Sequence, residues 1–271
     1  MKKNIKTIAS LAFVALLAAS CDGSNITKEE AQKRAKNMAD HESETATEVL
    51  EKGVHLSLKT KSVVKEVKSN ASMDIYFAKN YFHVAVSGKT EGGSTEGSTK
   101  SDIYFGKKDE KFYAINASSK EYAVLESATI AKFTDEVTEA VDSVLNLGSS
   151  DSLKKMLATF PQSSSTTEIG GYKHAYEMKS KGEGHLCLKS TTSYTGKEED
   201  KKSEIVYKLV VDNYRFASYN FSTSTTGVYA SVKASAKYSI SKSLPSVSGM
   251  KEVASASFEF NFELPDLGEL K

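Results

Sequence analysis

Tryptophan is absent from this 271-residue sequence, and cysteine and proline are scarce, with two and three residues. Without tryptophan the chain lacks the usual stacking platform for sugars, although tyrosine can substitute. Two cysteines cannot build the disulfide framework of a small secreted scaffold. Stability is therefore expected to come from packing of an ordinary protein interior.

The sequence also lacks a strong excess of either charge. Its net charge is +1, and loss of the first 20 residues would remove Lys2, Lys3 and Lys6 from the 36 basic residues, leaving 33 against 35 acidic ones. A nucleic-acid partner is not expected, because such proteins carry a marked basic excess gathered on one face. The hydrophobic fraction of 39% and the charged fraction of 26% are typical of a globular protein.

The first residues have the layout of a secretion signal. A basic stretch is followed by an apolar run from Ile8 to Ala19 that only Ser10 interrupts, and Ser20 and Cys21 come next. Cations stay on the cytoplasmic side while a run of about 12 apolar residues enters the translocon. The run is too short for a permanent span, which takes about 20 residues.

The segment Leu17-Ala18-Ala19-Ser20-Cys21 resembles the lipobox of bacterial lipoproteins. The resemblance implies that Cys21 is acylated, becomes the mature N-terminus and fixes the protein to the extracytoplasmic face of the cell membrane. Two acyl chains make such an anchor stable. One departure is that Ala18 stands where this family prefers leucine. The alternative is an ordinary cleaved signal with a chance cysteine.

This interpretation divides the chain into a signal peptide at 1–20, a tether at 21–26 and a single α+β domain at 27–271. With Cys21 occupied by lipid, Cys187 has no partner and no internal disulfide can form. In the alternating run around it, Cys187 is expected to be a small packed strand residue rather than a reactive thiol.

The mature chain alternates between helical and strand patterns. Thr27 to Glu30 has the spacing of a capping box, which predicts a helix from about Lys28 to Met38. From Val54 the period becomes two, and Asp74-Ile75-Tyr76-Phe77 recurs as Asp102-Ile103-Tyr104-Phe105, which indicates two similar hairpins. A 3.6 period between Ser127 and Phe160 predicts a helical pair, the second helix being capped by Ser150 or Asp151.

Strands are predicted again in the rest of the chain. Their ranges are 172–179, 184–194, 203–211, 215–223, 228–240 and 255–264. In the last of these, Phe258, Phe260 and Phe262 alternate with polar residues, so one face is expected to be buried.

We therefore predict an α+β fold in which a large curved antiparallel sheet, an incomplete barrel, is covered by amphipathic helices. This order of elements resembles the LolA and LppX-like families of lipid-handling proteins, and the resemblance implies an apolar cavity between sheet and helices. The predicted lining is Phe133, Val137, Val141, Phe258, Phe260 and Phe262. Alternatively, these side chains pack against one another as core.

No motif predicts catalysis, a cofactor or a metal. The five histidines show no pair at metal-binding helical spacing, although His83, His174 and His185 can still converge from neighbouring strands. Ser152 to Lys155 matches a Ser-x-x-Lys pattern, but its companion motifs are missing and chance explains the match. We therefore expect a protein that is not an enzyme.

Two hypotheses remain for its function. The first is a tethered carrier of a lipid or another hydrophobic ligand. The second is an envelope protein without a small-molecule site, whose sheet face or loops contact another protein or the cell wall. A solute-binding transporter subunit needs alternating strands and helices, and the long helix-free runs disfavour it.

Overall fold

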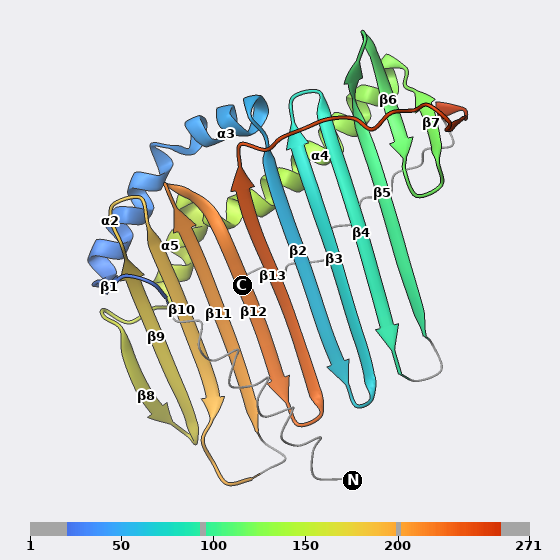
Figure 1. The fold of residues 1–271 in the computed structure, drawn as a ribbon. Helices are drawn as coiled ribbons and strands as arrows, with labels where there is room; N and C mark the ends of the chain where they lie inside the picture. Colours follow the sequence, from blue (N-terminus) through green and yellow to red (C-terminus); the bar gives the residue numbers. More distant parts are fainter. Residues whose placement is uncertain (1–20, 93–95, 199–201, 256–271) are drawn as a thin grey trace.

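The computed structural model describes residues 21–92, 96–198 and 202–255. The predicted signal peptide and the phenylalanines of the final strand therefore lie outside the described residues. The described chain forms one broad sheet, with helices gathered near one end of its strands (Figure 1). None of its described helices is long and apolar enough to cross a membrane.

Two antiparallel meanders make up the sheet and meet in its middle. Strand β13 pairs with β2 over their whole lengths, with Val228 opposite Val64 and Tyr238 opposite Val54. The first meander contains β2 (Val54–Val64), β3 (Val67–Ala78), β4 (Tyr81–Glu91), β5 (Gly97–Lys108), β6 (Lys111–Asn116) and β7 (Glu121–Val124). The second contains β8 (Ser165–Ile169), β9 (Tyr172–Ser180), β10 (Leu186–Tyr194), β11 (Ser203–Asp212), β12 (Arg215–Thr225) and β13 (Val228–Tyr238).

Short strands complete the two outer edges. Strand β1 (Ser24–Asn25) pairs with β9 at one edge, and β14 (Lys251–Glu252) pairs in parallel with β7 at the other. The described sheet thus has 14 strands and stays open, where about ten strands were expected. The short edge pairs and β8 account for much of the excess, because such brief segments carry no periodic pattern in the sequence.

In the described residues, four helices and one turn of 3-10 helix form the second layer. They are α2 (Lys28–Ala39), α3 (Glu42–Glu51), α4 (Ser127–Leu145), η1 (Asn146–Gly148) and α5 (Ser150–Ala158). The predicted capping box of α2 is confirmed, because the Glu30 amide donates to Thr27 Oγ1 and the Thr27 amide donates to Glu30. The cap of α5 is Ser149, one residue before the predicted ones, because η1 extends the preceding helix toward it.

Helix ends are tied to one another across this layer. Lys28 Nζ donates to the Phe160 carbonyl at 2.7 Å, just after the C-terminus of α5. At the other end of α5, the Ser150 amide donates to Glu42 Oε1 at 3.0 Å. Lys28 is positive and lies at the negative, C-terminal end of the α5 dipole, and Glu42 is negative and lies at its positive, N-terminal end. Both contacts are therefore electrostatically favourable. The layer is thereby fixed as a unit.

The helices cover only part of the sheet, so the predicted helical cover is smaller than expected. We call residues 54–58, 73–78 and 82–86 of β2–β4 the covered half, and residues 59–64, 67–72 and 87–91 the uncovered half. In β2, Val54, Leu56 and Leu58 are fully buried, whereas Thr60 and Ser62 continue the same face without being buried. The strands simply extend beyond the helices (Figure 1).

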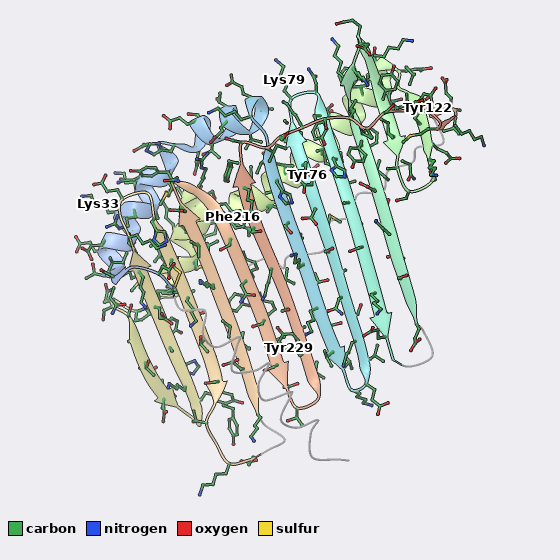
Figure 2. All side chains as sticks on the ribbon, viewed as in Figure 1. Lys33, Tyr76, Lys79, Tyr122, Phe216 and Tyr229 are labelled. Carbon is green, nitrogen blue, oxygen red and sulfur yellow. A yellow bond between two sulfur atoms is a disulfide. The ribbon has the colours of Figure 1, made fainter. Side chains whose placement is uncertain are left out.

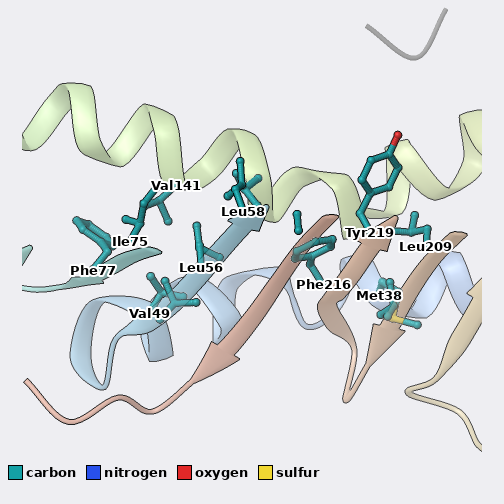
Figure 3. Close-up of a cluster of buried hydrophobic side chains, with 14 of the residues drawn as sticks. Met38, Val49, Leu56, Leu58, Ile75, Phe77, Val141, Leu209, Phe216 and Tyr219 are labelled. Atoms are coloured by element: carbon teal, nitrogen blue, oxygen red, sulfur yellow. The ribbon is translucent and has the colours of Figure 1, made fainter. Parts of the chain in front are cut away.

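The hydrophobic core lies between the helices and the covered half. Val141 of α4 is seen beside Ile75 and Phe77, and Val49 of α3 lies close to Leu56 (Figure 3). Each of these buried side chains contributes about 1.5–3 kcal/mol through removal of apolar surface from water. The core therefore concentrates the folding energy at one end of the strands.

Candidate functional site

Helix α4 presents an apolar stripe to the sheet, as its sequence period predicts. Val137, Val141 and Val144 recur at helical spacing and are all buried. Val141 packs in the core among sheet residues, so for this side chain the core interpretation is the better one. Nothing is described of the Phe133 side chain, and Phe258, Phe260 and Phe262 lie outside the described residues. Of the two predicted lining residues whose side chains the structure describes, Val137 borders a cavity, although it also belongs to the hydrophobic core.

This cavity, which we call the α4 pocket, has a volume of about 170 Å³. Its floor is the covered half of the sheet, and its roof is the first half of α4. Helix α4 contributes Ile130, Thr134, Val137 and Thr138, and the opposite walls are Leu50, Phe77, Phe82, Phe105, Phe112 and Leu125 together with the β3–β4 turn.

The two threonines do not make the α4 pocket polar. Thr134 Oγ1 donates to the Ile130 carbonyl at 2.9 Å, and Thr138 Oγ1 donates to the Thr134 carbonyl at 2.7 Å. A hydroxyl bonded to the preceding helical turn is satisfied and has little need of another partner. The wall that these residues form is therefore effectively aliphatic.

A turn with a left-handed residue shapes the mouth of the pocket. Asn80 has φ of 60°, a conformation that asparagine tolerates better than most residues. It joins β3 to β4, and its carbonyl accepts a hydrogen bond from the Lys107 amide at 3.1 Å. Tyr81 follows, and burial raises the pKa of its hydroxyl to about 12. Tyr81 thus remains a neutral hydrogen-bond donor at physiological pH.

A second cavity of about 290 Å³ adjoins the α4 pocket. Leu50, Phe77 and Thr138 line both cavities, so they form the partition between them. Leu50 of α3 is 48% exposed. The partition is therefore open to solvent at α3.

The second cavity is more polar than the first. Arg215 forms an ion pair with Glu48 and lies over the Tyr238 ring at 4.4 Å. Burial raises the pKa of the Asp142 carboxyl, which also lines this cavity. The apolar walls of the α4 pocket thus adjoin the charged walls of the second cavity, an arrangement suited to a ligand with a hydrophobic end and a polar end.

The two cysteines form a disulfide, which overturns the prediction that Cys187 has no partner. Cys21 Sγ is bonded to Cys187 Sγ, the two Cα atoms are 5.6 Å apart, and both residues are buried. Strand pairing explains why the two cysteines meet: β1 pairs with β9, and β9 pairs with β10, so Cys21 lies beside the start of β10. Two-residue strands such as β1 leave no periodic pattern from which this edge pairing could be predicted. A cysteine in a disulfide has no sulfur valence left for a thioether to lipid, so this disulfide and acylation of Cys21 exclude each other. The predicted acylation therefore requires a form of the protein in which Cys21 is not bonded to Cys187.

The described histidines do not converge. His83 lies on β4 and His174 on β9, which are seven strands apart in the sheet order, and His185 precedes β10. Across the described ranges, no cluster of His, Cys, Asp and Glu could hold a metal ion. The predicted alternative of a histidine cluster is therefore wrong.

Two histidines instead join a row of stacked rings on the face opposite the helices. His55, Tyr76, His83 and Tyr104 come from four successive strands, and their neighbouring ring centroids are 4.1, 5.0 and 3.8 Å apart. His55 Nε2 bonds to Asp74 at 2.8 Å and His83 Nε2 to Asp102 at 2.6 Å. We call this row the ring ladder; it fixes the register of β2–β5.

The sequence contains a signal for the ring ladder that the prediction of two similar hairpins does not use. Each copy of the repeated Asp-Ile-Tyr-Phe segment has a histidine 19 residues before its aspartate. This spacing, and not a search for metal ligands, indicates which aspartate each histidine meets.

Comparisons with known proteins give little further guidance. No protein-family model matches the chain, and no curated protein matches it. Among solved structures, the chain is similar to the crystal structure of LprF from Mycobacterium bovis, with 10% sequence identity and a TM-score of 0.29. The match covers 83% of this chain and 99% of the LprF chain. At this TM-score, neither family membership nor function follows from the likeness.

Proposed function

We propose that this protein is an extracytoplasmic, lipid-anchored protein that holds a short hydrocarbon segment in the α4 pocket. The observation that carries the proposal is the apolar cavity bordered by Val137 between α4 and the covered half of the sheet. The pocket is open to solvent on one side, so part of its apolar lining, such as Leu50, faces water. A bound apolar group would remove that surface from water, which is favourable.

The volume limits what the α4 pocket can accept. An apolar cavity of about 150 Å³ stays dry and admits a benzene-sized molecule, whereas pockets for drug-sized ligands begin at about 300 Å³. At about 170 Å³, the α4 pocket suits a single ring or the end of one acyl chain, not a whole lipid. The remainder of a longer ligand would lie past Leu50, toward the polar walls of the second cavity.

Binding of an apolar fluorophore tests the pocket. We expect N-phenyl-1-naphthylamine to gain fluorescence with the purified protein, with its phenyl ring in the α4 pocket and its naphthyl group past Leu50, and we expect lauric acid to displace it. Thr134→Phe places a ring in the pocket mouth and Val137→Phe fills its interior, so both should weaken binding at least about tenfold. Circular dichroism verifies that the variants fold.

Thr47→Phe is the matched control, because Thr47 is an exposed threonine of α3 that bonds to its preceding turn but does not line the pocket. It should bind the fluorophore like the wild type. Equal binding by folded Thr134→Phe and Val137→Phe variants would refute the proposal for the α4 pocket.

The lipid anchor is tested separately, through Cys21. Palmitate labelling of the wild type and of Cys187→Ser, with no labelling of Cys21→Ser, is the expected result. Absence of label on the wild type, together with two cysteines that react with maleimide only after reduction, would mean that the disulfide and not lipid occupies Cys21. That outcome would remove the anchor from the proposal and leave the pocket untouched.

We also propose a second candidate function, contact with a component of the cell envelope through the sheet. The observation in its favour is the uncovered half, which projects beyond the helix layer with polar side chains on both faces. A sheet that served only to close a ligand cavity would not need this extension. Deleting the uncovered half would shorten the strands of the sheet, so the better test is to replace its charged side chains with neutral ones.

A further inference from the structure

Lysines gather in the uncovered half on the face opposite the helices. Lys59 of β2 lies directly across from Lys233 of β13, and Lys61 lies two residues further along β2 on the same face. All three side chains are exposed. Within the described ranges, none of them has a carboxylate partner, whereas Lys89 nearby is paired with Glu91.

This alignment is unfavourable for folding by itself. Like charges directly opposite each other in an antiparallel pair destabilise the sheet. A second such pair, Lys189 opposite Lys208, lies at the same level of the sheet, but there Glu177 accepts from Lys189 at 3.0 Å. No acid relieves Lys59 and Lys233 in the described chain. Local features that oppose stability are a mark of functional surfaces.

The three lysines border a groove of about 480 Å³, together with Lys89, whose charge is already paired with Glu91. Its other walls are polar: Asn70, Ser72 and Ser87 supply amide and hydroxyl groups, and Tyr229 supplies one ring, over which Lys61 Nζ lies at 6.0 Å. Tyr229 is seen on the sheet, well away from the helices (Figure 2). The groove is large enough for a ligand unit and is uncovered in the described structure.

From this groove we infer that the uncovered half binds an anionic polysaccharide, with Lys59, Lys61 and Lys233 contacting its sulfate or carboxylate groups. The inference rests on the second candidate function and is independent of the α4 pocket. Sugar hydroxyl groups can form hydrogen bonds with the amide and hydroxyl groups of the groove walls, and the ring of Tyr229 offers an apolar face for a sugar ring. An acidic protein partner would instead require an apolar anchoring pocket, which these walls lack.

Nucleic acid fits the groove less well than a charged sugar polymer does. Single strands bind through several aromatic faces on which successive bases stack. Tyr229 is the one aromatic residue among the described lining residues of the groove. The balance of charge, hydroxyl groups and a single ring thus favours the polysaccharide.

Binding of defined polymers to the full chain tests the inference. Biolayer interferometry should detect dextran sulfate and hyaluronate, with affinity falling as salt rises, and should detect no neutral dextran. The variant K59Q/K61Q/K233Q should lose at least about tenfold in affinity, because three charge contacts are removed. The control K33Q/K155Q/K237Q carries the same change in net charge outside the groove and outside the α4 pocket, and it should lose less than about twofold.

Three results would overturn the inference. They are absence of binding to both anionic polymers, an equal loss in the two triple variants, and binding of poly-glutamate or single-stranded DNA at least as tightly as dextran sulfate. Fluorophore binding in the α4 pocket should be the same in both triple variants. The failure of one site is therefore distinguishable from the failure of the other.

Discussion

The covered and uncovered halves of the sheet are built from the same strands, yet they are held together differently. In β2, Leu56 and Leu58 are sealed beneath α4, whereas Thr60 and Ser62 on the same face lack a helix above them. The covered half is stabilised by burial of apolar surface, and the uncovered half by its strand ladder and cross-strand contacts. One strand can thus serve as core at one end and as a display surface at the other.

The largest expected effect comes from the disulfide, which ties the start of the chain to the covered end of β10. In the chain from Cys21 onward, purified without lipid and oxidised, Cys187→Ser should lower the free energy of unfolding by roughly 5 kcal/mol, because the bond closes a loop across 166 residues. Urea denaturation with and without reductant measures this. An unchanged unfolding midpoint would show that the bond contributes nothing.

A pair of substitutions in β2 compares the halves directly. Leu56→Ala should cost about 3 kcal/mol, because it leaves a cavity in the fully buried core. Thr60→Ala, on the same face in the uncovered half, should cost less than about 0.5 kcal/mol. Urea unfolding of both variants provides the measurement. Similar costs would mean that the uncovered half is packed against something after all.

A smaller effect should appear in acid, again at the covered end. Burial lowers the pKa of His185, whose Nδ1 accepts from the Lys181 amide at 3.2 Å. The unfolded chain therefore takes up this proton first, and the contribution to stability is complete above about pH 6.5 and lost as pH falls toward the folded-state pKa. His185→Asn keeps an acceptor but does not titrate. Its stability should fall less than that of the wild type between pH 7.5 and 5.

The smallest effect concerns the opposed lysines of the uncovered half. Lys233→Glu converts a like-charge pair with Lys59 into an opposite-charge pair, so the free energy of unfolding should rise by roughly 0.5 kcal/mol. The same variant should bind dextran sulfate more weakly. A loss of stability would show that the two lysines do not repel each other in the folded protein.

The elements that the sequence predicted well are those with a long periodic pattern. Regular spacing of apolar residues predicts three parts of the fold: the helix from Lys28, the helical pair between Ser127 and Ala158, and the long hairpins of β2–β5. Edge strands such as β1, β8 and β14 could not be predicted, because two to five residues carry no measurable period. Of the predicted lining, Val137 and Val141 both belong to the hydrophobic core, and Val137 also borders the α4 pocket, so the ligand-binding role of these residues stays a prediction.

By itself, the sequence determined the alternation of buried and exposed side chains, since strand and helix periods fix which residues share a face. It also determined that α4 would present an apolar stripe to the sheet. Only the tertiary structure decided that Cys21 meets Cys187, that Lys59 faces Lys233 and that the ring ladder crosses four strands. These are contacts between distant segments, and they depend on strand order and register, which a local pattern does not encode.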